Sequence, residues 1–347
     1  MRPIRYMGIH FIIPPYMLEE IAKRGKPRQR DWALRNLASA GFIRGERFAL
    51  GMLPVLAPIR YKYRAVYDCK HKNGEPPVGT LVRKEGDPPG KDVAVNEAYE
   101  GAGATYDLYY DIYERNSIDN RGMSMVSYVH YDVNYENAFW DGREMVYGDG
   151  DADIFDRFTK CIDVIGHELT HGVTQYEANL AYSDQSGALN ESMSDVFGSL
   201  VKQRTLKQTA AKADWLIGSG LFMPNIDGKA LRSMKAPGTA YDDPVLGKDP
   251  QPATMKDYVE TTSDNGGVHI NSGIPNHAFY LAAAEIGGNS WKKAGKIWYI
   301  ALRDRLRSGT NFEGAAYATI SVAKDLYGSG SKEMKAVRKA WKAVGVI

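Results

Sequence analysis

Cysteine is scarce in this sequence, and long runs of apolar side chains do not occur. The 347 residues include two cysteines, Cys69 and Cys161, which lie 92 positions apart. Such a pair does not make the framework of a disulfide-rich protein. A helix that crosses a membrane needs about 18 consecutive apolar residues, and no such run is present. The sequence therefore excludes a disulfide scaffold and predicts no membrane span, although the low cysteine count does not decide the compartment.

An excess of charge of either sign is also lacking. Lys and Arg number 44 and Asp and Glu 42, which gives a formal net charge of +2. Both signs are mixed along most of the chain, and this is not the pattern of a nucleic-acid-binding surface. With 44% hydrophobic and 25% charged residues, the chain is long and apolar enough for one large or two ordinary globular domains.

The first 50 residues differ in charge from the rest. They contain ten Lys and Arg against four Asp and Glu, a net charge of +6, so the remainder carries −4. Helical patterns at 16–23 and 31–41 follow Pro14-Pro15, and the Gly- and Pro-containing stretch 48–58 is typical of an extended linker. The segment is either a pro-segment that covers an acidic cleft or a helical extension packed on the body, and the sequence favours neither.

The N-terminus is a poor candidate for a signal peptide. It has a basic start, but its apolar run is short and is interrupted by His10 and Pro14. No small-residue cleavage site follows, as secretory signal peptides require.

The rest of the chain changes from strand patterns to helical patterns. Short β-type runs separated by Pro and Gly turns occupy 61–95, and another strand is expected at 124–134. Between them, Tyr residues recur every three or four positions along 97–115, which predicts a helix whose aromatic stripe faces the core. Residues 208–270 are rich in loops, and helical patterns dominate from 272 onward. The sequence predicts an α+β protein with a β-rich first part and a helical second part.

The densest chemistry lies in the stretch His167-Glu168-Leu-Thr-His171. Residues four apart on a helix lie one above the other, so the two imidazoles face the same side. That geometry suits Zn²⁺, which at a catalytic site takes three protein ligands and keeps one position open for water. The alternative is a helix that carries two ordinary histidines.

A third ligand must come from another segment. Glu177 fails on geometry, because six residues past His171 correspond to about 600°, or 240° modulo a turn. A second helix, entered through the polar turn 183–187, would bring Glu191 back toward the imidazoles. Asp195, one turn beyond Glu191, is placed to accept the remaining N–H of a ligand histidine.

Glu168, between the two histidines, is the expected general base. Its carboxylate can take a proton from a zinc-bound water and deliver it to a leaving amine. The developing oxyanion needs a second donor across the cleft, for which His269 and Tyr182 are candidates.

Two other features have plainer interpretations. His130 is expected to be structural, because no second metal ligand lies near it in the sequence. The acidic turn 148–153 could bind Ca²⁺, but it lacks the full twelve-residue loop pattern and is interpreted as a plain turn.

Four motifs, taken in order, make the chain resemble a known family. They are 137–140 (Asn-Ala-Phe-Trp), 167–171 (His-Glu-Leu-Thr-His), 190–195 (Asn-Glu-Ser-Met-Ser-Asp) and 266–273 (Gly-Gly-Val-His-Ile-Asn-Ser-Gly). They look like those of the thermolysin-like zinc metallopeptidases, and the likeness covers about residues 60–347. The short N-terminal segment with Pro14-Pro15-Tyr-Met-Leu18 is similar to the protealysin branch, which has a brief propeptide.

The resemblance implies a fold and a division of the chain. The expected fold is a β-rich N-terminal lobe and an α-helical C-terminal lobe with the active-site cleft between them. The corresponding parts are a pro-segment at 1–50, a first catalytic lobe at 51–166 and a second at 167–347.

The resemblance also implies roles for individual residues. His167, His171 and Glu191 would bind the catalytic zinc, with Asp195 behind them. Glu168 would be the general base, His269 a transition-state donor held by Asp264, and Tyr182 a second donor. Asn137 and Ala138 would pair with the substrate backbone, and Arg232 would bind a substrate carbonyl. The pocket past the scissile bond would be lined by Phe155, Phe158, Val164 and Leu231, which predicts cleavage on the amino side of bulky hydrophobic residues.

One departure concerns calcium. Where many relatives have a Glu, this chain has Lys202, eleven residues after Glu191, while Asp163 is retained. The stretch 213–218 is poor in companion acids. We therefore expect the family's double calcium site to be absent, and a single calcium site stays undecided.

The function expected from these features is a zinc endopeptidase made as an autoprocessed precursor. Its partners would be peptide and protein substrates and its own pro-segment as an intramolecular inhibitor, with no nucleic acid and no membrane, in a monomer. We expect secretion without a conventional signal peptide, or else a cytoplasmic location. The alternatives are a zinc aminopeptidase, for which no amine anchor is apparent, and a silent zinc-folded binding protein, which would have no use for Glu168.

Overall fold

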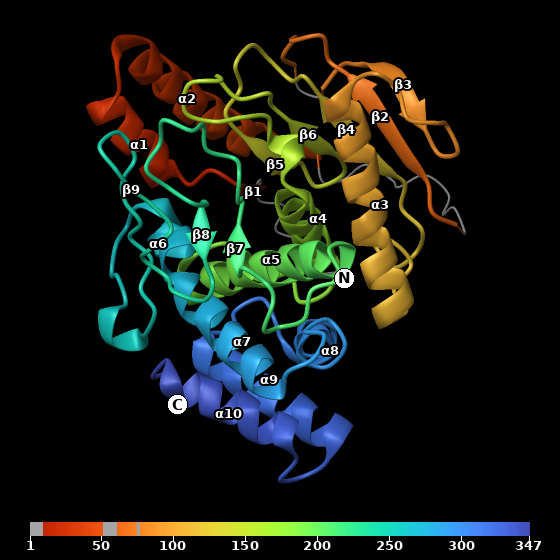
Figure 1. Cartoon of the computed structure of the whole chain (residues 1–347), viewed down its shortest axis with the longest axis vertical. Coiled ribbons are helices and arrows are strands. Elements are labelled where there is room, and N and C mark those ends of the chain that lie inside the picture. Colours follow the sequence, from red (N-terminus) through yellow and green to blue (C-terminus); the bar gives the residue numbers. More distant parts are fainter. Residues whose placement is uncertain (1–9, 51–60, 75–76) are drawn as a thin grey trace.

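Two central helices, α4 (Ile162–Tyr176) and α5 (Asp184–Thr205), separate a β-rich lobe from a helical lobe (Figure 1). The structure is a computed structural model, and it describes residues 10–50, 61–74 and 77–347. The β-rich lobe comes first in the chain and the helical lobe second, as the sequence predicts. The two-lobed α+β fold is therefore confirmed.

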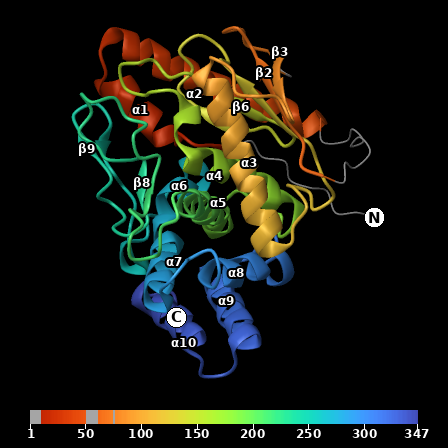
Figure 2. The same ribbon diagram turned by 45° about the vertical axis from the view of Figure 1, so that its right-hand side comes forward.

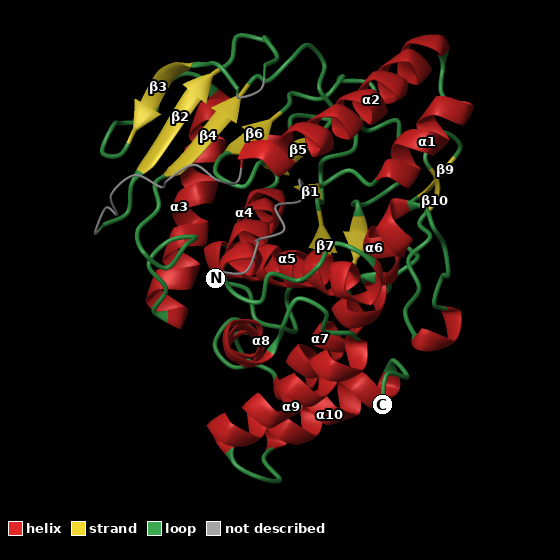
Figure 3. Ribbon diagram, turned by 180° about the vertical axis from the view of Figure 1, so that it is seen from behind, coloured by secondary structure: helices red, strands yellow, loops and turns green. Residues whose placement is uncertain are grey.

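The β-rich lobe contains a six-stranded sheet in the order β1-β5-β6-β4-β2-β3 (Figure 3). β2 pairs in parallel with β4, and β4 pairs in parallel with β6, whereas the remaining pairs are antiparallel. The strands are β1 (His10–Phe11), β2 (Arg64–Asp68), β3 (Thr80–Lys84), β4 (Met125–Val129), β5 (Ala138–Trp140) and β6 (Met145–Tyr147).

The long helix α3 (Val93–Tyr113) packs against β2 and β4. Asp92 is its N-cap, and the Asp92 side chain accepts a hydrogen bond from the amide of Val95. Its tyrosines at 99, 106, 109 and 113 are all buried. The predicted aromatic stripe therefore does face the core.

Helices α4 and α5 pack with their backbones close together. A side chain at Gly198 of α5 would overlap the carbonyl oxygen of Asp163 on α4. Glycine at this position lets the helices pack closely enough for side chains of both to meet in one site.

The helical lobe follows the loop-rich stretch predicted at 208–270, in which four two-residue strands form two small ladders. These strands are β7 (Leu216–Ile217), β8 (Arg232–Ser233), β9 (Asp242–Asp243) and β10 (Gly247–Lys248). The helices are α6 (Asp264–Asn271), α7 (Gly273–Ile286), α8 (Ala294–Ile300) with a π-helical turn at Ala301–Arg305, α9 (Phe312–Tyr327) and α10 (Lys332–Ala343).

The N-terminal segment contains two helices, α1 (Pro15–Arg24) and α2 (Pro27–Leu50), at the upper edge of the molecule (Figure 2). Pro15 occupies the first helical position, where its missing N–H costs no hydrogen bond. The second helix is longer than the 31–41 pattern predicts. The expectation of extended chain from residue 48 is wrong for 48–50, which are helical, and 51–58 lie outside the described residues.

Both cysteines are buried free thiols, in agreement with the predicted lack of a disulfide framework. Over the described ranges, no helix combines the length and the apolar character that a membrane crossing requires.

Candidate active site

Helices α4 and α5 bring His167, His171 and Glu191 together in the interior. The Nε2 atoms of the two histidines lie 3.0 Å apart. Glu191 Oε2 lies 3.4 Å from Nε2 of His167, and Oε1 lies 3.5 Å from Nε2 of His171. All three side chains are at most 1% exposed.

The hydrogen bonds behind the imidazoles favour a cation at this point. Nδ1 of His167 lies 2.8 Å from Asp195 Oδ1, and Nδ1 of His171 lies 2.9 Å from Asn190 Oδ1. Both partners are acceptors, so each Nδ1 carries the proton and each Nε2 presents a lone pair. Within the part of the chain that the structure describes, Glu191 Oε2 accepts no hydrogen bond. Two lone pairs and a buried carboxylate that converge in this way fit a Zn²⁺ ion.

Asp195 connects the imidazoles to a second element. Its carboxylate accepts a bidentate pair of hydrogen bonds from Arg232 of β8, at 2.9 Å from Nε and 2.8 Å from Nη2. Asn276 Nδ2 of α7 donates to it at 2.8 Å. Although burial would raise the pKa of Asp195, the positive charge of Arg232 and the bond to His167 hold it at about 2. Asp195 is therefore an anion that orients both a histidine and an arginine.

Glu168 lies on α4 between the two histidines, and its carboxylate contacts strand β5. Its Oε2 accepts the backbone N–H of Trp140 at 3.0 Å. Its Oε1 is buried and, among the described residues, has no hydrogen-bond partner. Burial raises the pKa of Glu168 to about 8, and the negative charge of Glu191 adds to this while His167 opposes it. A carboxylate oxygen that is fixed on one side and vacant on the other can accept a proton.

His269 and Tyr182 both lie beside Glu191. The Tyr182 hydroxyl donates to Glu191 Oε1 and lies 3.2 Å from His269 Nε2. Asp264 accepts from His269 Nδ1 at 2.6 Å and from its backbone N–H at 2.8 Å. Burial lowers the pKa of His269, but the charges of Asp264 and Glu191 outweigh burial and raise it. The imidazole is therefore held as a donor toward the cleft.

The chain between Asp264 and His269 explains this contact. Residues 264–267 all have positive φ, with 53° at Asp264 and 84° at Gly266. This left-handed stretch, which two glycines make accessible, turns the carboxylate back onto the histidine that follows it.

A segment from the N-terminus fills the space between these groups. Strand β1 pairs antiparallel with β5, with Phe11 opposite Phe139. The Ile12 N–H donates to the carbonyl of Ala138 at 3.2 Å, and the Ile13 N–H donates to Asn137 Oδ1 at 3.0 Å.

The carbonyls of the same segment face the cationic side of the cleft. His269 Nε2 lies 3.1 Å from the Phe11 oxygen, and Arg232 Nη1 donates to the Ile12 oxygen at 3.3 Å. Sequence reasoning assigned no role to 11–13. The available signal was the apolar Ile12-Ile13 pair before Pro14-Pro15, but nothing local connects it to residues more than 200 positions away.

The four residues expected to line the specificity pocket are buried in the same apolar cluster as Ile12. Phe155, Phe158, Val164 and Leu231 are each at most 1% exposed. The rings of Phe155 and Phe158 lie 5.8 Å apart between centroids.

Lys202 stands at the position where the sequence suggests a departure from calcium-binding relatives. Its ammonium is 2.8 Å from Asp163 Oδ2 and 3.0 Å from Asp214 Oδ1, and it donates to the carbonyl of Leu216 at 2.6 Å.

In the acidic turn 148–153, Asp151 Oδ1 accepts backbone N–H groups of residues 153, 154 and 155 at 2.8–3.1 Å. That carboxylate closes a turn.

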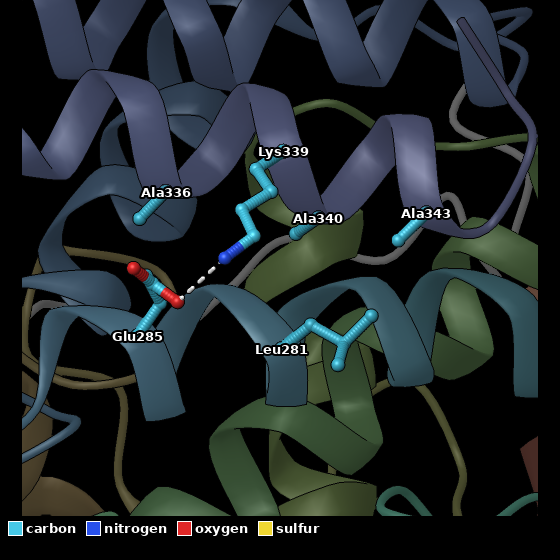
Figure 4. A pocket seen from close by; sticks show the side chains of 6 residues that line it. All are labelled: Leu281, Glu285, Ala336, Lys339, Ala340 and Ala343. Atoms are coloured by element: carbon cyan, nitrogen blue, oxygen red, sulfur yellow. Dashed lines mark hydrogen bonds and ion pairs between the residues drawn. The ribbon is translucent and has the colours of Figure 1, made fainter.

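A separate hollow lies between α7 and α10 (Figure 4). The Lys339–Glu285 ion pair, 3.1 Å long, lies at this hollow, which is otherwise lined mainly by alanines. It contains none of the His, Glu or Tyr side chains described above, so the chemistry of the chain does not reside there.

Comparison with known proteins agrees with this geometry. Residues 60–175 match the thermolysin metallopeptidase catalytic domain, and 178–346 match the alpha-helical domain of the same family. The chain belongs to the thermolysin family of metallopeptidases. It is a zinc metalloendopeptidase, as the resemblance in the sequence implies.

Several relatives cover nearly the whole chain. An extracellular metalloprotease of Pectobacterium carotovorum is 48% identical over 96% of each protein. Protease PrtS of Photorhabdus is 46% identical over 96% of this chain and 91% of its own length. The solved precursor of protealysin, a metalloproteinase from Serratia proteamaculans, superposes with a TM-score of 0.89 at 52% identity, over 97% of this chain and all of that one.

Proposed function

We propose that this thermolysin-family peptidase is made as a precursor whose pro-segment, residues 1–50, occupies the substrate-binding cleft until the enzyme removes it. The observation that carries the proposal is the path of residues 11–13. Their N–H groups and carbonyls are bound by the residues expected to hold a substrate: Asn137, Ala138 and Arg232.

The register of this segment suggests which substrate positions it imitates. The Phe11 carbonyl faces His269, and the Ile12 side chain is buried in the main apolar core, to which Phe155 and Leu231 also belong. The Phe11–Ile12 bond thus takes the place of a scissile bond, with Ile12 as the residue after it. This supports cleavage on the amino side of bulky hydrophobic residues.

In the proposed mechanism His167, His171 and Glu191 hold zinc. When bound, zinc lowers the pKa of water to around 7 and polarises the scissile carbonyl. Glu168 takes the proton of the attacking water on Oε1 and delivers it to the leaving amine, while Trp140 fixes its other oxygen.

The remaining residues act on the substrate. His269, positioned by Asp264, and Tyr182 donate hydrogen bonds to the oxyanion that develops. Asn137, the carbonyl of Ala138 and Arg232 align the substrate as an added strand beside β5. Asp195 orients His167 and Arg232 together.

We further propose that the ammonium of Lys202 replaces the ions of the family's double calcium site, because it already pairs with Asp163 and Asp214. We propose that the protein is secreted, since relatives such as the Pectobacterium protein are named extracellular, and that it acts as a monomer.

Mutation of Glu168 tests the catalytic assignment. The full-length chain, its Glu168→Gln variant and a Glu313→Gln control are incubated with a large protein, a blocked peptide and a free-amine peptide. We expect internal cleavage and N-terminal shortening by the parent and the control, and neither by Glu168→Gln. Cleavage of the free-amine peptide alone would indicate an aminopeptidase, and equal activity of Glu168→Gln would refute the role of Glu168.

A binding measurement tests the pro-segment separately. In the inactive Glu168→Gln chain, a fluorescent blocked peptide should bind poorly, because residues 11–13 occupy the cleft. Ile12→Asp places a charge in the apolar cluster and should weaken the binding of the pro-segment, which competes with the peptide for the cleft. If the pro-segment binds about 1.4 kcal/mol less tightly, the peptide affinity rises about tenfold, and we expect at least that increase. Equal affinity with and without Ile12→Asp would contradict the proposed occupation.

A further inference from the structure

A second group of potential metal ligands lies outside the cleft, in the β-rich lobe. His71, His130 and Asp149 each offer one ligand atom, and these atoms all lie within 4.8 Å of one another. His71 is exposed, whereas His130 and Asp149 are half-buried. The sequence places no second ligand near His130, but the fold brings His71 to it from 59 positions earlier in the chain.

The topology of the sheet brings these residues to one edge. β2, β4 and β6 are parallel neighbours, with Asp68 opposite Val129 and Tyr128 opposite Val146. His71, His130 and Asp149 each follow the carboxyl end of one of these strands within three residues. Carboxyl ends of adjacent parallel strands lie side by side, so loops that follow them converge.

Backbone hydrogen bonds fix the loops relative to one another. The His71 N–H donates to the carbonyl of His130 at 2.9 Å, and the Tyr131 N–H donates to the carbonyl of Tyr147 at 3.1 Å. His71 and His130 have φ of 57° and 54°, in the left-handed region that non-glycine residues rarely adopt. The backbone thus holds both imidazoles on the same side, 5.5 Å apart between ring centroids.

Asp92 orients the imidazole of His130 from behind. Its Oδ2 lies 2.9 Å from Nε2 of His130, and its Oδ1 accepts the Val95 N–H at the start of α3. Nδ1 of His130 faces Asp149 at 2.8 Å, and Nδ1 of His71 lies 3.5 Å from the same carboxylate. A carboxylate behind a ligand imidazole is the usual outer partner of a histidine that binds a metal.

We propose that His71, His130 and Asp149 bind a divalent transition-metal ion, Zn²⁺ in the first instance, at a site independent of the peptidase centre. Two imidazole nitrogens and one carboxylate suit Zn²⁺, whereas Ca²⁺ and Mg²⁺ take oxygen ligands. The exposed position of His71 leaves a coordination place for water.

The site would stabilise one wall of the cleft. Asp149 lies between Gly148, whose N–H donates to the carbonyl of Asn137 at 2.9 Å, and Gly150, whose N–H donates to that of Tyr135 at 3.1 Å. An ion on Asp149 would therefore restrain the loop that supports the start of β5. Zinc at this site should raise the stability of the β-rich lobe without being required for cleavage.

A different account of the same contacts needs no ion. Hydrogen bonds to Asp149 and Asp92 raise the pKa of His130 to about 9 against the opposing effect of burial. A protonated His130 could simply pair with both carboxylates. A metal must displace the proton on Nδ1, and direct measurement of metal uptake distinguishes the two accounts.

The test uses the full-length Glu168→Gln chain, which retains the zinc ligands of the peptidase centre. After it is loaded with one equivalent of Zn²⁺, further Zn²⁺ is titrated by calorimetry, and bound zinc is counted after gel filtration. Parallel titrations use Ca²⁺ and Mg²⁺. The variants are His71→Gln, which changes an exposed side chain, Asp92→Asn, and His277→Gln as a control histidine outside both groups.

We expect the parent and His277→Gln to take up a second zinc and no calcium or magnesium at that site. His71→Gln and Asp92→Asn should weaken the second zinc by about 10- to 100-fold, with the first zinc retained as evidence of folding. Uptake of one zinc only by the parent would overturn the proposal and leave the ion-pair account. A second zinc bound equally well by His71→Gln would also overturn it.

Discussion

The buried ammonium of Lys202 allows a quantitative test of the proposal that it takes the place of calcium. Its side chain is 9% exposed and pairs with Asp163, whose side chain is 2% exposed. Lys202→Met keeps most of the length of the side chain but removes the ammonium, and among the described residues the Asp163 carboxylate then keeps the backbone N–H donors of Val164 and Gly218. Removal of one partner of a buried ion pair typically costs about 3–5 kcal/mol, and we expect a loss of that size in the free energy of unfolding.

Lys202→Glu makes a sharper version of the same change. The group Lys202, Asp163 and Asp214 has a formal charge of +1 − 2 = −1, and the variant has −3. Without a cation this variant should be less stable than Lys202→Met. Three carboxylates form an oxygen-ligand set for Ca²⁺, so calcium at about 100 times its dissociation constant should restore about 2.7 kcal/mol.

Urea unfolding of the zinc-loaded Glu168→Gln chain, with and without Ca²⁺, measures both effects. Mg²⁺ serves as the ion control and Lys212→Met, at an exposed lysine, as the matched substitution. A Lys202→Met variant within about 0.5 kcal/mol of the parent, the range of ordinary surface changes, would show that the ion pair does not stabilise the fold as proposed. The proposal would also be refuted if Ca²⁺ stabilised the parent as much as Lys202→Glu.

Three further predictions concern the cleft and its supports. Asp195→Asn should weaken zinc about 10- to 100-fold, because it removes the charged partner of His167; competition with a chelator measures this, and unchanged affinity would contradict it. His269→Gln should lower kcat about 100- to 1000-fold with a much smaller change in KM, as loss of an oxyanion donor does; steady-state kinetics on the processed enzyme would show a KM effect instead if His269 only bound substrate. Burial and the charge of Asp151 raise the pKa of Glu136 well above 4.5, so the folded chain keeps a proton that the unfolded chain releases, and stability should fall as pH rises from about 4.5 toward the folded-state pKa. Glu136→Gln should flatten this fall in thermal melts of the inactive chain between pH 5 and 8, and parallel profiles would contradict the assignment.

The parts of the site that helix geometry governs could be predicted from the sequence. The four-residue spacing of His167 and His171 and the return of Glu191 on a second helix depend on rules that hold within one turn or one helical hairpin. The structure brings all three together, and it places Asp195 behind His167 as the one-turn spacing from Glu191 suggests. Local periodicity likewise predicted the buried tyrosines of α3.

The parts that depend on long-range pairing could not be predicted in the same way. Strand patterns do not specify that β2, β4 and β6 run in parallel, so the meeting of His71 with His130 was missed. The pairing of β1 with β5 joins segments nearly 130 residues apart. Each strand is only two or three residues long, too short for a periodic signal to identify its partner.

Asp195 binds both His167 and Arg232, and it should therefore keep Arg232 in place when the proposed precursor is activated. Arg232 donates two hydrogen bonds to Asp195 at the same time as it donates to the Ile12 carbonyl. Removal of Ile12 therefore takes one of its contacts and leaves the guanidinium in the same orientation, since the carboxylate is itself fixed by His167 and Asn276. The folded protein already restricts the conformations of the Arg232 side chain, so a substrate that binds it does not have to. Release of the pro-segment should accordingly expose a preformed substrate site, because the groups that bind residues 11–13 are anchored from behind by the chain and do not depend on the segment for their position.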